Sequence, residues 1–94
     1  MSPSTLDVQP TPNPNAIKFS LDVPTTDGSP KTFRNAGEAA GTPLARELFA
    51  IPGVVYVFMT SNFISVNKSP ESRWEEIVPR ATLAIGKQFG IETP

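Results

Sequence analysis

The sequence predicts an α+β fold: a two-layer sandwich in which a four-stranded antiparallel sheet carries helices on one face. Alternating apolar residues indicate half-buried strands at residues 17–23 and 63–68. Apolar residues at helical spacing indicate amphipathic helices at residues 43–50 and 74–89. With the two further strands described below, the order is β-β-α-β-β-α, which is typical of helices packed on one face of an antiparallel sheet.

The first strand follows a stretch with three prolines, QPTPNPNAIKF. Residues 1–8 are polar and aperiodic, so we expect a flexible N-terminus there and a single domain over residues 9–94. A proline biases the residue before it toward extended backbone, so Gln9, Thr11 and Asn13 are predicted to be extended. The stretch is therefore expected to be a stiff lead-in to the strand.

A second strand is expected at residues 31–35, with Phe33 facing inward. The turn-forming segment TTDGSP, centred on Asp27 and Gly28, separates it from the strand at residues 17–23. This short separation predicts that the two strands pair as a hairpin.

The apolar run VVYVFMT is typical of a central strand that is covered on at least one side. Alternation places Val55, Val57 and Met59 on one of its faces. Tyr56 and Phe58 then lie on the other face, where they would form an exposed apolar patch if helices cover only one side of the sheet.

A two-residue SN turn is expected to join this run to the strand at residues 63–68, which makes a second hairpin. The closing helix is predicted to begin at a capping box made by Ser72 and Glu75. Pro79 lies inside this helix and is expected to kink it, and Gly90 is a plausible stop.

The composition excludes several kinds of chemistry. The 94 residues carry a net charge of −1 and include no cysteine and no histidine. Thiolate or imidazole ligation of zinc or of an iron–sulfur cluster is therefore excluded within this chain, as are Ser-His relays. No basic cluster favours DNA, and no acidic cluster favours magnesium or calcium. We expect no enzyme activity and no cofactor bound by this chain itself.

The sequence also carries no mark of export or of membrane insertion. The first residues lack the apolar segment of a signal peptide, and the longest apolar run is far below the roughly 20 residues of a membrane helix. We expect a cytoplasmic protein that does not bind membranes and that is a monomer.

Four segments of the chain resemble the Nfu/NifU N-terminal domain family: TPNPNAIKF, TPLARELFAIPGVVYVFM, SNFISVNK and RWEEIVPRATLAI. The resemblance implies an α+β fold, a bacterial stand-alone version of the domain, and a place in iron–sulfur cluster assembly or delivery. In two-domain relatives a CxxC pair in a separate C-terminal domain binds the cluster. Because this chain has no cysteine, cluster ligation is carried over to none of its residues.

The resemblance implies a non-catalytic module that binds a protein partner, such as an iron–sulfur assembly scaffold or a client. The candidate recognition edge is formed by Thr11, Asn13, Asn15 and Lys18. The competing interpretation is that the two asparagines only bond nearby backbone groups, as turn formers do.

Two alternative functions stay open. The first is a peptide- or anion-binding module for phosphorylated segments, which would use Lys18, Arg34 and Arg46 together with an open strand edge. The second is single-stranded RNA binding through aromatic residues on the sheet face. The net charge of −1 opposes the second alternative.

Overall fold

A computed structural model describes residues 6–26 and 29–91 of the chain. It confirms the α+β class, with one antiparallel sheet and helices. The elements are β1 (Leu6–Pro10), β2 (Ala16–Leu21), β3 (Lys31–Phe33), α1 (Ala36–Ala39), α2 (Pro43–Phe49), β4 (Val54–Thr60), β5 (Phe63–Lys68) and α3 (Trp74–Phe89). The sheet thus has five strands rather than the predicted four, and the chain order is β-β-β-α-α-β-β-α.

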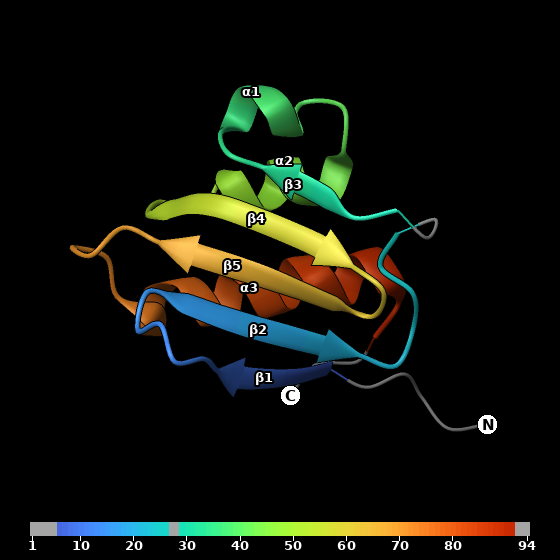
Figure 1. The fold of residues 1–94 in the computed structure, drawn as a ribbon, viewed down its shortest axis with the longest axis horizontal. Coiled ribbons are helices and arrows are strands. Elements are labelled where there is room, and N and C mark those ends of the chain that lie inside the picture. Colours follow the sequence, from blue (N-terminus) through green and yellow to red (C-terminus); the bar gives the residue numbers. More distant parts are fainter. Residues whose placement is uncertain (1–5, 27–28, 92–94) are drawn as a thin grey trace.

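The strand order across the sheet is β1-β2-β5-β4-β3 (Figure 1). The predicted hairpin between the strands now seen as β2 and β3 is wrong. β2 is hydrogen-bonded to β1 on one side and to β5 on the other, so it has no free edge for β3. β3 instead pairs with β4 at the far edge. The chain therefore passes from β2, next to one edge of the sheet, to β3 at the opposite edge. The predicted Asp27-Gly28 turn between these strands lies outside the described residues.

Residues 6–8, which the sequence places in a flexible N-terminus, belong to β1. Val8 lies opposite Phe19 of β2, and Leu6 packs against the core. A short edge strand escapes a periodicity analysis because most of its side chains stay exposed. Pro10 fits at its end because an edge strand tolerates a missing backbone N–H. Residues 1–5 lie outside the described part of the chain.

The helices cover one face of the sheet, and α2 and α3 lie behind the strands in Figure 1. α1 begins at Asn35, whose Oδ1 accepts a hydrogen bond from Glu38 N at 2.9 Å. α2 has Pro43 in its first turn, where the missing N–H costs nothing. None of the helices within residues 6–26 and 29–91 is long and apolar enough to cross a membrane.

The predicted capping box of α3 is wrong. The N-cap residue is Arg73, and it makes no side-chain cap bond. The Ser72 Oγ lies 2.8 Å from Ser69 Oγ instead. Pro79 lies inside α3, which continues through it to Phe89, and Gly90 follows as the C-cap with φ 67°.

The core lies between the sheet and the helices. Its largest fully buried side chains come from five elements and are Phe19, Leu48, Ile64, Ile77, Ile85, Val57 and Val66. The predicted position of Val55 beside Val57 is wrong, since Val55 is 47% exposed. A register shift between Val54 and Tyr56 interrupts the alternation and turns Val54 into the core instead.

Candidate functional site

The first three residues of the predicted recognition edge lie in the β1–β2 loop and bond to the loop itself. Thr11 Oγ1 lies 2.9 Å from the Asn13 carbonyl oxygen and 3.0 Å from that of Ala16. The Asn13 Oδ1 accepts a hydrogen bond from Asn15 N at 2.9 Å. These bonds are those of an Asx-type turn, in which a side chain substitutes for a backbone partner.

The same loop is bonded to the last residue of β5 and to the first residue of α3. Asn15 Oδ1 accepts from Lys68 Nζ at 3.1 Å, and the Asn15 carbonyl accepts from Lys68 N at 2.8 Å. Trp74 Nε1 donates to the Pro14 carbonyl at 2.9 Å, and Lys68 Nζ lies 5.7 Å from the centre of the Trp74 ring. We call this assembly, residues 11–15 together with Lys68 and Trp74, the corner. It joins two parts of the chain that are more than fifty residues apart in the sequence.

Lys18 is placed elsewhere, on the side of the sheet away from the helices. The strand register puts one residue of each strand in a single row across this side: Gln9, Lys18, Ser65, Phe58 and Thr32. Lys18 Nζ lies 4.5 Å from the centre of the Phe63 ring, which is within cation–π distance. The Phe58 and Phe63 rings are 6.1 Å apart. Of the four predicted edge residues, Lys18 thus lies apart from the other three.

We call this surface the open face and define it by Lys18, Tyr56, Phe58, Phe63 and Ser65. Within the described residues, the helices pack against the other side of the sheet (Figure 1), yet these five residues are half-buried because they cover one another. The ion pair found within the described residues joins Arg73 to Glu75, so Lys18 has no carboxylate partner there. The open face therefore offers aromatic surface beside one cation.

The structure does not bring Lys18, Arg34 and Arg46 together. β5 and β4 separate β2 from β3, which Arg34 follows, and neighbouring strands lie about 4.8 Å apart. Arg46 lies on α2, in the helix layer. The anion site expected from these three cations is thus not formed, because they lie on different parts of the molecule.

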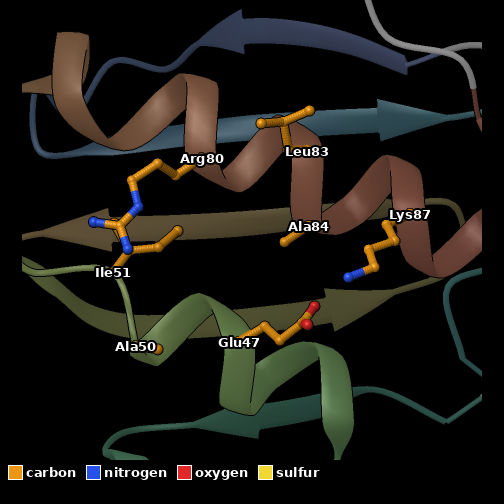
Figure 2. A pocket seen from close by; sticks show the side chains of 7 residues that line it. All are labelled: Glu47, Ala50, Ile51, Arg80, Leu83, Ala84 and Lys87. Atoms are coloured by element: carbon orange, nitrogen blue, oxygen red, sulfur yellow. The ribbon is translucent and has the colours of Figure 1, made fainter.

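Sequence reasoning missed a hollow on the helix side, between α2 and α3. This hollow has a volume of about 420 Å³ and is lined by Ile51, Pro52, Glu76 and Arg80. A second hollow of about 270 Å³ shares Ile51 and Arg80 and extends along the two helices (Figure 2). The available signal was Leu83, an apolar residue off the buried stripe of α3, which is 62% exposed.

The residues present do not fit an iron–sulfur cluster. Clusters are held by cysteine thiolates, with histidine as the alternative, and the sequence has neither. Among the described residues, no three Asp or Glu side chains converge as a metal site would require. No step of cluster chemistry can therefore be assigned to side chains of this chain.

The fold and the sequence both match known proteins. The structure aligns with the solution structure of a NifU-like protein from Saccharomyces cerevisiae with a TM-score of 0.79 and 25% identity, over 94% of this chain and 80% of that one. The family model for the N-terminal part of the scaffold protein Nfu/NifU matches residues 6–90. This chain belongs to the Nfu/NifU N-terminal family.

Curated relatives agree with this assignment. The chain is 39% identical to NifU-like protein 5, mitochondrial, of Arabidopsis thaliana, over 79% of this chain and 27% of that protein. It is 33% identical to the NFU1 iron-sulfur cluster scaffold homolog, mitochondrial, of Drosophila ananassae, over 95% of this chain and 32% of that protein. The chain thus spans about a quarter to a third of these relatives.

Proposed function

We propose that this Nfu/NifU N-terminal domain is a non-catalytic protein-binding module of iron–sulfur cluster assembly, and that it contacts its partner through the open face. The family description as a scaffold protein and the Drosophila relative's name support the pathway. The observation that supports this binding surface is the row of half-buried aromatic and polar side chains around Lys18, on which none of the described helices packs.

The open face has the chemistry of a protein interface. Aromatic rings supply large contact areas at a small entropic cost, and they are enriched at interfaces. The Lys18 ammonium sits beside the Phe63 ring without a carboxylate partner among the described residues. A partner with an apolar contact next to a carboxylate would match this arrangement.

The iron–sulfur cluster is cargo held by the partner in this proposal, since this chain supplies no thiolate or imidazole. The partner is accordingly an assembly scaffold or a client that carries the cluster on its own ligands. One copy of the chain is the binding unit, because a single copy contains the whole open face. The cytoplasmic location and the bacterial origin expected from the sequence stay predictions, since the relatives include mitochondrial proteins.

A titration tests the proposal. The affinity of the chain for a cluster-loaded iron–sulfur scaffold protein is measured by calorimetry for the wild type and for the Lys18→Ala/Phe58→Ala variant. We expect at least about a tenfold loss of affinity in the variant, equivalent to roughly 1.4 kcal/mol. The matched control is Lys31→Ala, which removes an exposed lysine from β3 and should leave the affinity unchanged.

Equal affinity of the wild type and the double variant would contradict the proposed surface. The Arg46→Ala variant separates the anion-binding alternative, because only that alternative predicts a loss on removing a cation from α2. A strong loss of affinity between about 0.05 and 0.5 M salt would likewise favour binding through charges over binding through the aromatic rings.

A further inference from the structure

The helix side carries a stripe of exposed residues along α3: Glu76, Arg80, Leu83 and Lys87. Their spacings of four, three and four residues place them on one side of the helix. The buried residues of α3 lie on a different side, against the core. Leu83 is the most exposed large apolar side chain in the described part of the chain, at 62%. We call these four residues the α3 stripe.

The α3 stripe borders the hollow between α2 and α3. Glu76 and Arg80 line the hollow of about 420 Å³ beside Ile51. Arg80, Leu83 and Lys87 line the adjoining hollow of about 270 Å³. Figure 2 shows Leu83 on the outer side of α3 and the Arg80 side chain reaching toward Ile51. The lining of the two hollows combines apolar residues, Ile51 and Leu83 among them, with the charged side chains of Glu47, Glu76, Arg80 and Lys87. A protruding apolar side chain and a partly apolar hollow therefore share one surface.

The charges of the α3 stripe are complementary to those of a second, antiparallel copy of the stripe. When two copies of α3 pack antiparallel around a two-fold axis between residues 81 and 82, Glu76 of each copy lies opposite Lys87 of the other. Leu83 of each copy lies opposite Arg80 of the other, at the hollow. A parallel arrangement would instead place Glu76 against Glu76 and Lys87 against Lys87, and like charges repel. The charge pattern thus selects one orientation.

None of the charges of the α3 stripe is used in an ion pair within residues 6–26 and 29–91, where the pair formed is that of Arg73 and Glu75. Glu76 and Lys87 are eleven residues apart, or about 16 Å along the helix. Antiparallel packing would therefore place one ion pair at each end of the contact and the two Leu83 side chains between them. Such a contact is isologous, which is the commonest arrangement in homodimers.

We propose that this chain forms a weak symmetric dimer through the α3 stripe, with Leu83 of each copy covering the hollow beside Ile51 of the other. α3 is 16 residues or about 24 Å long, so the contact falls in the small size class of transient interfaces. The monomer expected from the sequence is then the form at low concentration. The open face lies on the other side of the sheet, so this inference does not rest on the proposed function.

Sedimentation equilibrium of the purified chain from about 10 μM to 1 mM tests the dimer. We expect the apparent mass to rise with concentration from 10.1 kDa toward twice that value. Glu76→Lys and Lys87→Glu, made separately, should each weaken the dimer at least about tenfold, because each turns both ion pairs into repulsions. Leu83→Ala should weaken it as well. Lys31→Glu, a charge reversal outside the α3 stripe, is the matched control and should not weaken it.

The combinations decide the register. The Glu76→Lys/Lys87→Glu variant should recover the dimer, and so should an equimolar mixture of the two single variants, because both arrangements restore opposite charges at each end. Thermal melting of each variant shows that the exposed substitutions leave the fold intact. A mass of 10.1 kDa at every concentration, unchanged association in the single variants, or no recovery in the combinations would each overturn the proposal.

Discussion

The corner and the open face are both candidates for partner recognition, and they differ in whether their polar groups are bonded within the chain. In the corner, Asn13, Asn15 and Trp74 direct their polar groups to partners within the chain. On the open face, the Lys18 ammonium lies over the Phe63 ring, and the Phe58 ring lies beside that of Phe63. The polar groups of the corner thus hold the fold together, whereas the Lys18 ammonium has no carboxylate partner among the described residues.

The difference teaches how to weigh a specific sequence motif. The TPNPN stretch is the most distinctive part of the chain, but its bonds connect the β1–β2 loop to the start of α3. These bonds give the motif a structural interpretation, in which its side chains hold the backbone of the loop. A change in the corner should therefore lower stability, whereas a change on the open face should lower binding. Four predictions, from the largest effect to the smallest, test this contrast.

Phe19→Ala shows how much stability is lost when a side chain on the helix-covered side of the sheet is removed. Phe19 is adjacent to Lys18 on β2 but faces the core, where it is fully buried. We expect the free energy of unfolding to fall by about 3–5 kcal/mol, as is usual for a buried phenylalanine. Urea unfolding followed by circular dichroism measures it. A loss below about 1 kcal/mol would show that Phe19 does not belong to the core.

Gly53→Ala tests the contact of Gly53 with the segment that links the two corner residues Lys68 and Trp74. Gly53 has φ 99°, and a β-carbon there would lie 2.6 Å from Ser72 Cβ. Its carbonyl also accepts from Ser69 N at 2.9 Å. We expect a loss of about 2–3 kcal/mol in urea unfolding, from backbone strain and the contact with Ser72. Gly41→Ala is the control, since a β-carbon at Gly41 meets nothing within 4 Å, and an equal loss there would remove the explanation.

Trp74→Phe removes one bond of the corner and keeps an aromatic ring beside Lys68. The indole N–H donated to Pro14 is lost, so we expect about 1 kcal/mol less stability. The affinity of the folded variant for the cluster-loaded scaffold protein should stay the same. If this variant binds tenfold more weakly with its melting temperature unchanged, the corner takes part in recognition and the contrast fails.

Lys18→Ala should have the smallest effect on stability and a measurable effect on binding. The contact of Lys18 with Phe63 is partly exposed, so its loss should cost at most about 0.5–1 kcal/mol. Thermal melting and calorimetric titration on the same sample separate the two quantities. A large drop in melting temperature with no change in affinity would assign Lys18 to the fold instead.

The sequence predicts the elements whose side chains alternate clearly between core and solvent. β5 and the inward direction of Ile64 and Val66 follow from period two, and α2 follows from helical spacing together with Pro43. β1 escapes prediction because an edge strand buries too little to leave a pattern. The partners of β2 and β3 escape it because local spacing carries no information about pairing between distant strands.

The candidate sites divide in the same way. Alternation along β4 places Tyr56 and Phe58 on the side of the strand opposite Val57 and Met59, where the structure has them half-buried. The hydrogen-bond partners of Asn15 and Trp74 could not be predicted from the sequence. Lys68 is more than fifty residues from Asn15 along the chain, and Pro14 is more than fifty residues from Trp74. The hollow beside Ile51 depends on how α2 and α3 pack, which neither helix specifies alone.

Chemical-shift mapping tests the contrast between the two regions most directly. Isotope-labelled chain is titrated with an unlabelled cluster-loaded scaffold protein in its diamagnetic state. The account predicts that the largest shift changes fall on the open face, at Lys18, Tyr56, Phe58, Phe63 and Ser65, while Thr11, Asn13 and Asn15 in the corner stay nearly constant. The largest changes in the corner, with the open face unaffected, would contradict it.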